Sequence, residues 1–500
     1  MVFPIVGGNQ STGDFITNSL RLNDDDSPSL SLDLSSPNTD KFTLSMWVKM
    51  TGARTQLGSL GKRLTGEAGD NRSIDIEQGS TGRLGISAYN GVADSNVAAY
   101  NSNTGEGPLL RDTSAWYHFV YAFDTGQGTA ANRFKWYING VLQSGYNTTT
   151  TPSQNADLFD SSGSMIRIGK AINNESRFGD MYIAQYYYVD GQQYDHTYFG
   201  EFNDNGVWVP VENGKGAGGA ITFGTNGFYL EFKQTGTSAN ASGIGADTSG
   251  NGKHLTPANL AAIDITTDTP QNNFCTMNPL MSFAGASDGI DAFSEGNTVV
   301  DSNNDTSAAG STFGVKNGKW YYEAKLITGD QSSTNFSTGW CQVDYEGQKG
   351  TGNGVGFMSG EDNASMDVGG NIIFNNSGSG NQATFGNRST NDIFQVAVDL
   401  DNNKMWFGVN GTWSNGSASQ STTFDASNSD FSSIFDTAGV DYMPAFAQSS
   451  TGQTVLAYNF GNPSYSISSG NADANGYGNF EYAVPSGFYS LCTKNLAEYG

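Results

Sequence analysis

The sequence predicts an all-β protein, and three observations lead to that fold class. Charged residues make up only 15% of the 500 residues whereas aromatic residues make up 12%, a balance that excludes a disordered chain. The 65 glycines, with abundant Asn, Ser and Thr, separate short apolar runs and therefore indicate many turns. No long stretch repeats its apolar residues with the 3.6-residue period of a helix, and coiled-coil heptads are missing.

The early strands are predicted from alternating apolar residues. In 42–49, the side chains of one face point into a core between two sheets, namely Phe42, Leu44, Met46 and Val48. A second strand covers Trp116–Asp124, and a third covers Arg133–Ile138. The third ends in Asn139-Gly140, the strongest short hairpin signal, because both residues tolerate positive φ.

Residues 164–210 organise the first half of the chain. They contain a short strand, Met165–Ile168, and a longer strand, Met181–Val189. A strict period of two places four side chains of the longer strand on one face, namely Tyr182, Ala184, Tyr186 and Tyr188. Both faces carry large side chains, so the strand is either covered on both sides or exposes aromatic rings for binding.

Four short runs carry a resemblance to a known family: Gly179–Ala184, Val189–Gln192, Phe199–Phe202 and Gly206–Pro210. They resemble the closing strands of a laminin-G/concanavalin-like jelly roll, in the version found in bacteriophage virion proteins. The pattern F-x-x-x-x-W-V of the strand at 42–49 is typical of the same domains. The resemblance implies a β-sandwich and a viral origin.

The second half begins a new series of motifs. These are G-K-W-Y-Y-E from Gly318, G-V-G-F at 354–357, L-D-N-N-K-M-W-F-G-V-N-G-T-W from Leu400, P-A at 444–445 and N-F-G at 459–461. Their order resembles an SPRY (B30.2-like) β-sandwich over residues 283–465. The two resemblances together imply two antiparallel, jelly-roll-like β-sandwich domains in tandem. We expect them at 1–280 and 281–466, with 467–500 as a tail packed on the second domain.

Charge and composition exclude several classes of function. The net charge of −25 argues against binding to nucleic acid or to an anionic membrane. No run of 18 apolar residues is present, so we expect no membrane insertion, and the N-terminus lacks the features of a signal peptide. The three cysteines and three histidines show no metal-ligand spacing, which favours synthesis in a reducing cytoplasm without export. The composition, in contrast, is that of an extracellular lectin. A phage protein made in the host cytoplasm and released by lysis fits both observations.

One strand raises the question of catalysis. A family of jelly-roll glucanases carries E-x-D-x-E on a strand, and the period of two projects all three carboxylates into the cleft. Here Asp75 and Glu77 match, but Ser73 stands in the place of the nucleophilic Glu. Retaining hydrolysis needs two carboxyl groups about 5 Å apart. We therefore expect no enzyme activity, and the alternative for this strand is a solvent-facing sheet edge.

Candidate sites for ligands and a metal follow from the same resemblances. Calcium, the one candidate cofactor, is assigned to Asp24 and Asp26, because laminin-G-like domains often bind calcium near loop carboxylates and hard cations prefer oxygen ligands. For a ligand, SPRY domains use loops at one end of the sandwich, which selects Trp340, Tyr345, Asn410 and Trp413. Tyr186 and Tyr188 add a sugar-stacking patch. For each aromatic residue, packing is the alternative.

The function that these observations favour is that of a non-enzymatic virion surface protein. It would act as a tail fibre or adhesin that binds a host cell-surface polysaccharide or receptor, alongside other virion proteins. Viral fibres commonly work as trimers because avidity multiplies weak binding, so we expect a homo-oligomer, with a trimer as the first guess. A purely structural capsid or tail decoration protein is the second candidate, and a depolymerising glycoside hydrolase is the third.

Overall fold

A computed structural model describes most of the chain and divides it into two compact units. The described residues are 13–52, 55–63, 71–78, 83–89, 96–100, 107–144, 151–172, 176–284, 290–303, 307–329, 336–343, 363–374, 385–416, 420–432, 435, 437, 439–448 and 452–500. The first unit ends at Gln271 and the second begins at Asn272. The sequence analysis placed the boundary after residue 280, but Met277–Ala284 forms a strand of the second unit.

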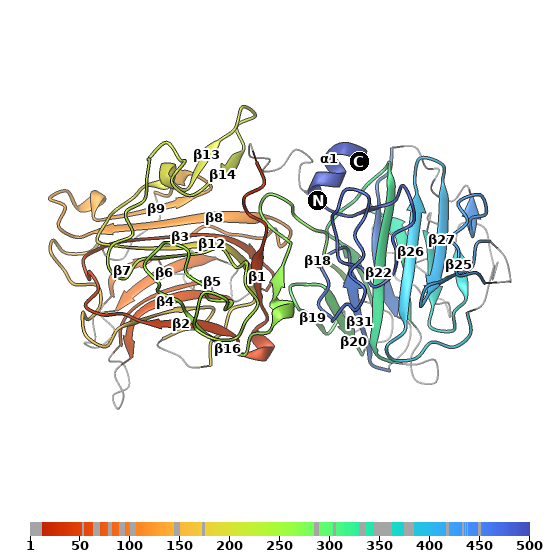
Figure 1. Cartoon of the computed structure of the whole chain (residues 1–500), viewed down its shortest axis with the longest axis horizontal. Helices are drawn as coiled ribbons and strands as arrows, with labels where there is room; N and C mark the ends of the chain where they lie inside the picture. Colours follow the sequence, from red (N-terminus) through yellow and green to blue (C-terminus); the bar gives the residue numbers. More distant parts are fainter. Residues whose placement is uncertain are drawn as a thin grey trace. The chain divides into compact units, whose positions relative to one another are not determined.

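Within the described residues, the first unit is a sandwich of two antiparallel sheets (Figure 1). The eight-stranded sheet contains β10 (Val141–Leu142), β9 (Phe134–Ile138), β8 (Trp116–Asp124), β3 (Lys41–Met50), β12 (Met181–Asp190), β1 (Ser19–Leu22) and β17 (Ile265–Thr266), with β15 (Phe228–Leu230) paired to β12. The seven-stranded sheet contains β16 (Thr256–Ala258), β2 (Ser29–Asp33), β11 (Met165–Ile168), β4 (Thr55–Arg63), β5 (Asn71–Gln78), β6 (Leu84–Tyr89) and β7 (Asn96–Tyr100).

The second unit, over the part of the chain that is described, contains a six-stranded and a nine-stranded sheet. The six-stranded sheet contains β18 (Met277–Ala284), β21 (Ser307–Ser311), β30 (Tyr442–Gln448), β23 (Phe336–Gln342), β24 (Asn363–Asp367) and β25 (Ile372–Phe374). The nine-stranded sheet contains β19 (Ala292–Ser294), β20 (Val299–Ser302), β31 (Thr454–Asn459), β22 (Lys319–Thr328), β26 (Ile393–Asp399), β27 (Lys404–Val409) and β28 (Thr412–Trp413), with β29 (Phe431–Ser432) paired to β27 and β32 (Tyr489–Ser490) to β22. The prediction of an all-β fold built from antiparallel sandwiches is confirmed.

Helical turns are short. They are η1 (Asp24–Asp26), η2 (Ala130–Asn132), η3 (His196–Tyr198), η4 (Ala262–Asp264) and α1 (Thr493–Tyr499). Across the described ranges, no helix has the length and apolar character needed to cross a membrane.

The core of the first unit lies between its two sheets. The predicted inward face of β3 is confirmed, because Phe42, Leu44, Met46 and Val48 all belong to this core. They pack against residues of the opposite sheet, including Ile74 and Ile76 of β5. Burial of such apolar side chains supplies most of the stabilisation of a sandwich.

The predicted faces of β12 are wrong at one point. The strand is buried along its whole length, but its pairing with β3 shifts between Ala184 and Tyr187. Gln185 has a φ of 46°, and this β-bulge reverses the faces. Tyr182 and Ala184 therefore lie on the outer face of the sheet, whereas Tyr186 and Tyr188 lie in the core between the sheets.

Two hairpins turn through an Asn-Gly pair in which both residues have positive φ. Asn139 and Gly140 have φ values of 46° and 75°, and Asn410 and Gly411 have φ values of 50° and 79°. In both hairpins the Asn side chain also accepts a backbone N–H bond, from His118 at 2.8 Å in one case and from Ile393 at 2.9 Å in the other. The prediction of a hairpin at Asn139-Gly140 is confirmed, and Asn410-Gly411 forms a hairpin of the same kind.

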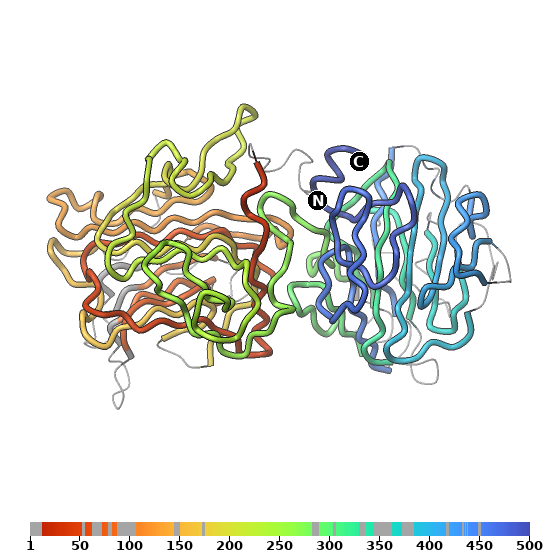
Figure 2. The backbone as a smooth tube through the Cα atoms, in the orientation of Figure 1, coloured from red at the N-terminus to blue at the C-terminus, as the bar shows by residue number. Residues whose placement is uncertain are grey.

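The outer face of the eight-stranded sheet is covered by residues 191–224, here called the covering segment (Figure 2, yellow to green). The segment contains η3 and the hairpin of β13 (Gly200–Phe202) and β14 (Trp208–Pro210). The indole of Trp208 stacks on the ring of His118 at 5.9 Å and donates Nε1–H to its Nδ1 at 3.1 Å. Positions 140 and 200 lie so close to this indole that only glycine fits.

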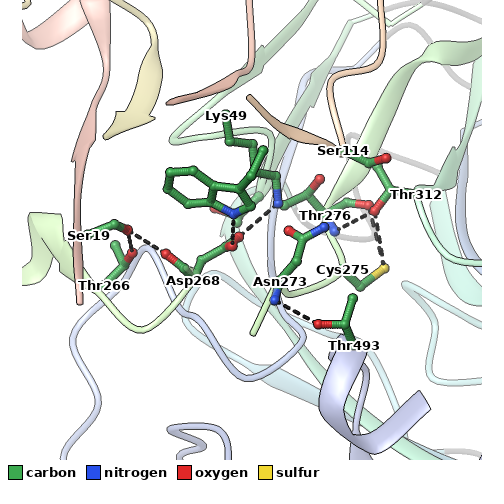
Figure 3. Close-up of polar contacts among 12 residues, drawn as sticks. Ser19, Lys49, Ser114, Thr266, Asp268, Asn273, Cys275, Thr276, Thr312 and Thr493 are labelled. Carbon is green, nitrogen blue, oxygen red and sulfur yellow. Dashed lines mark hydrogen bonds and ion pairs between the residues drawn. The ribbon is translucent and has the colours of Figure 1, made fainter. Parts of the chain in front are cut away.

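A buried ion pair joins the ends of the first unit to the same face. Lys49 Nζ lies 2.8 Å from Asp268 Oδ2, and both side chains have no exposed surface (Figure 3). Trp116 Nε1 donates to the other carboxylate oxygen at 3.0 Å, and Ser19 Oγ donates to the backbone carbonyl of Asp268. The pair fixes the last residues of the unit against β3 and β1.

In the second unit, the C-terminal tail lies against β22. The carboxylate of Glu323 accepts bonds from the backbone N–H groups of Glu481 at 2.9 Å and Tyr482 at 2.8 Å, and from Tyr321 Oη at 2.9 Å. Burial raises the pKa of Glu323 to about 7, against these donors, which lower it. Near the start of the unit, Asn273 and Thr493 bond to each other (Figure 3).

Gly200→Ala is expected to lower the free energy of unfolding by about 1–3 kcal/mol, the cost of overfilling a packed site. A Cβ at position 200 would lie 2.3 Å from Cζ2 of Trp208. Gly128→Ala is the matched control, because a Cβ there would meet no atom within 4 Å. Urea denaturation measures the difference, and equal stability of the two variants would contradict the described packing of Trp208.

Lys49→Met is expected to cost about 3–5 kcal/mol, because it leaves the carboxylate of Asp268 buried without its cation. Lys233→Met is the control, since the Lys233–Glu231 pair is exposed and worth at most about 1 kcal/mol. Thermal unfolding of both variants provides the comparison. A shift in midpoint no larger for Lys49→Met than for Lys233→Met would refute this role of the buried pair.

Candidate functional site

Strand β5 presents the residues that raised the question of catalysis. Ser73, Asp75 and Glu77 alternate with Ile74 and Ile76, which lie in the core, so the three polar side chains face away from it. The strand lies between β4 and β6, and Ser73 and Asp75 are 0% and 2% exposed. The alternative of a solvent-facing sheet edge is therefore wrong.

Both carboxylates of β5 are already engaged. The carboxylate of Asp75 accepts hydrogen bonds from Ser59 Oγ and, at 3.2 Å, from Ser73 Oγ. Burial raises the pKa of Asp75 from 3.8 to about 6, and these serine bonds lower it in part. Arg177 Nη1 lies 2.8 Å from Glu77 Oε2.

This arrangement does not supply a retaining hydrolase. Such an enzyme needs a carboxylate nucleophile and a second, accessible acid/base carboxyl group. Here Ser73 occupies the nucleophile's position, Asp75 is buried, and Glu77 is held as an ion pair with Arg177. The three residues instead take part in hydrogen bonds with Ser59 and in the ion pair with Arg177.

A buried Ser–His pair also lacks the arrangement of a nucleophile and its base. Ser45 Oγ lies 2.9 Å from His118 Nε2. Because the indole of Trp208 donates to Nδ1, the neutral imidazole carries its proton on Nε2 and donates it to Ser45. Burial lowers the pKa of His118 to about 3, so the ring is neutral at pH 7. His118 therefore packs against Trp208 and holds Ser45 by a hydrogen bond, and it does not accept a proton from Ser45.

The described aromatic residues proposed as ligand contacts are buried. Tyr186 and Tyr188 belong to the core of the first unit and Trp340 to the core of the second. Trp413 is 4% exposed, under Phe424 and Phe488. A ring without exposed surface cannot stack on a sugar, so these four positions favour packing over recognition.

The other proposed positions have different surroundings. Asn410 is exposed, but its side chain serves the hairpin, accepting from Ile393 N and donating to Asp392 at 2.7 Å. Tyr345 and the run at 354–357 lie outside the described residues. Asp24 and Asp26 lie in the exposed turn η1. In the described residues, no group of three or more His, Cys, Asp and Glu side chains could hold a metal ion, and calcium at η1 stays a prediction.

A further group of aromatic and apolar residues lies where the covering segment meets β9 and β10. We call it the aromatic patch, and it consists of Tyr137, Leu142, His196, Phe202 and Trp208. Successive rings lie close together, with centroids 4.7 Å apart for Tyr137 and His196, 5.4 Å for His196 and Trp208, and 5.0 Å for Trp208 and Phe202. Phe202 is 52% exposed and Leu142 is 50% exposed.

The sequence held a signal for this patch. The region 194–208 is rich in aromatic residues, but in the sequence it indicated only the resemblance to a jelly roll. The exposed ring of Phe202 follows from pairing of β13 with β14, which is not visible in the sequence alone.

Comparisons with known proteins agree with the fold. Residues 23–181 match the family model described as the concanavalin A-like lectin/glucanases superfamily. No curated protein matches the chain. The chain thus contains a concanavalin A-like jelly-roll domain, in an all-β protein.

Solved structures similar to the chain include domains LG4-5 of the mouse laminin α1 chain, with 10% identity, 97% of this chain and 89% of that chain covered, and a TM-score of 0.28. The SPRY domain of human HERC1 has 11% identity, covers 36% and 96%, and has a TM-score of 0.25. The CBM40 of Ruminococcus gnavus IT-sialidase bound to α2,3-sialyllactose has 16% identity, covers 33% and 87%, and has a TM-score of 0.23. Such scores carry no argument about function.

Asp75→Asn is expected to remove part of the pH dependence of stability. The folded protein holds a proton on Asp75 up to about pH 6, whereas the unfolded chain releases it near 3.8. Between these values the folded state binds more protons, so the free energy of unfolding falls as pH rises, by up to about 3 kcal/mol. Urea denaturation from pH 4 to pH 7 measures this fall, and parallel profiles for Asp75→Asn and the parent protein would count against the assignment.

Proposed function

We propose that this protein binds carbohydrate without catalysing a reaction on it. The match of residues 23–181 to a superfamily of lectins and glucanases leaves two classes of function open. The state of β5 favours the first class and is the observation that carries the proposal. The nucleophile's position holds Ser73, and the remaining carboxylates are buried or ion-paired.

We further propose that the protein is displayed on the surface of a tailed bacteriophage as a tail fibre or adhesin. The supporting residues are the four short runs between 179 and 210, which resemble the closing strands of a jelly roll found in phage virion proteins. The acidic composition suits a ligand other than nucleic acid or an anionic membrane. Assembly into a homo-oligomer, with a trimer as the first candidate, would multiply weak binding to a repetitive host polysaccharide.

The full chain, labelled with a fluorophore, is expected to bind intact host cells saturably and to be displaced by the polysaccharide of those cells. It should release no reducing ends from that polysaccharide, and Glu77→Gln should bind like the parent protein, since Glu77 is ion-paired with Arg177. Reducing ends that appear with the parent protein and disappear with Glu77→Gln would establish a hydrolase instead. A folded sample that binds no host cell would favour a structural role in the virion.

A chelator arm extends the same experiment to the calcium prediction. If calcium occupies Asp24 and Asp26, chelation should weaken binding or lower the thermal midpoint, and Asp26→Asn should reproduce the effect. Binding and stability unchanged by chelator would argue against a functional calcium at η1.

A further inference from the structure

The aromatic patch has two exposed apolar side chains, Leu142 and Phe202, joined through rings of which Tyr137 and Trp208 are each only 6% exposed. Among the described residues, five large hydrophobic side chains are strongly exposed: Val141, Leu142, Phe202, Leu280 and Ile327. The first three belong to the first unit, and Leu142 and Phe202 belong to the patch. Leu142 lies directly across from Tyr137 in the sheet and therefore shares its face.

The patch is held from beneath. Its central indole, Trp208, is fixed by the hydrogen bond to His118 and by the close approach of the backbone at Gly140 and Gly200. The turn after Phe202 is fixed as well, because the Asn203 side chain accepts from the backbone of Asn205 and Val207. A surface already held in one conformation loses little entropy when a ligand binds.

The charges around the patch are mostly negative. The covering segment carries four carboxylates and one cation, namely Asp195, Glu201, Asp204 and Glu212 against Lys215. Lys135 lies two positions before Tyr137 on β9 and adds one positive charge. Burial lowers the pKa of His196, so its ring is neutral at pH 7. An anionic ligand would meet net repulsion here.

We propose that the aromatic patch binds a neutral glycan, with the apolar face of a sugar ring packed on Phe202 and its neighbours. Sugar rings have one face made largely of C–H groups, and burial of this face against an aromatic ring removes apolar surface from water. Hydroxyl groups at the ring edge can donate to a carboxylate beside the patch, such as Asp195, which precedes His196 at the start of η3. This inference rests on the proposed carbohydrate-binding function. It adds where on the protein the carbohydrate binds, and that the bound carbohydrate is uncharged.

The test measures binding of the full chain to immobilised neutral polysaccharides (dextran, β-glucan and galactomannan) and anionic ones (alginate and hyaluronan) by biolayer interferometry. We expect saturable binding to the neutral class. Phe202→Ala should raise Kd about tenfold or more, as expected for a central aromatic contact, and Leu142→Ala should raise it less. Leu280→Ala is the matched control, because it removes a 66%-exposed apolar side chain from the second unit.

The other possible results test the proposed site and the proposed function separately. If the parent protein binds and Phe202→Ala binds equally well, the site is refuted and the proposed function stands. Binding of anionic polysaccharides alone refutes the neutral class. If Phe202→Ala changes the molar mass measured by light scattering and leaves glycan affinity unchanged, the patch is a contact between copies of the chain, which refutes the inference. Absence of binding to both classes overturns the inference and the proposed function together.

Discussion

Both faces of the eight-stranded sheet are built for burial, and the need to cover the second face determines much of the first unit. Strand β12 is buried along all its residues, and the outer face carries Trp47, Trp116 and the charged pair of Lys49 with Asp268. The rings are removed from water only when the chain covers them, and the cost of burying the ions is offset by their own attraction and by the hydrogen bond from Trp116. The chain after β12 therefore folds back over the sheet and is fixed there by the Trp208–His118 contact.

The second unit meets the same requirement with a different segment. Its C-terminal tail lies against β22, where the carboxylate of Glu323 gathers two backbone N–H groups of the tail and the hydroxyl of Tyr321. Around it, Trp406, Trp413, Phe480 and Phe488 form one buried cluster. In both units a polar group that would be costly to bury alone is satisfied by the covering chain, so that covering and sheet depend on each other.

Local patterns predicted several strands of the first unit but not the features that decide the site. The period of two identified β3, β8, β11 and β12, and the Asn139-Gly140 pair identified one hairpin. The bulge at Gln185 has no local signature, yet it moves Tyr186 and Tyr188 from a candidate binding face into the core. The burial of Asp75 likewise depends on Ser59 of the neighbouring strand, a pairing between distant residues that one sequence does not reveal.

The covering also decides where recognition can occur in the first unit. A jelly-roll sheet with an open face can hold a ligand on its strands, but here the outer face is already occupied by the chain itself. The contacts that close this face hold Trp208 rigid, and Trp208 in turn supports the exposed ring of Phe202. The covering thus converts a buried aromatic face into a small, fixed surface with an acidic border. Such a border discriminates by repelling anions, so specificity would come from charge exclusion as much as from attractive contacts.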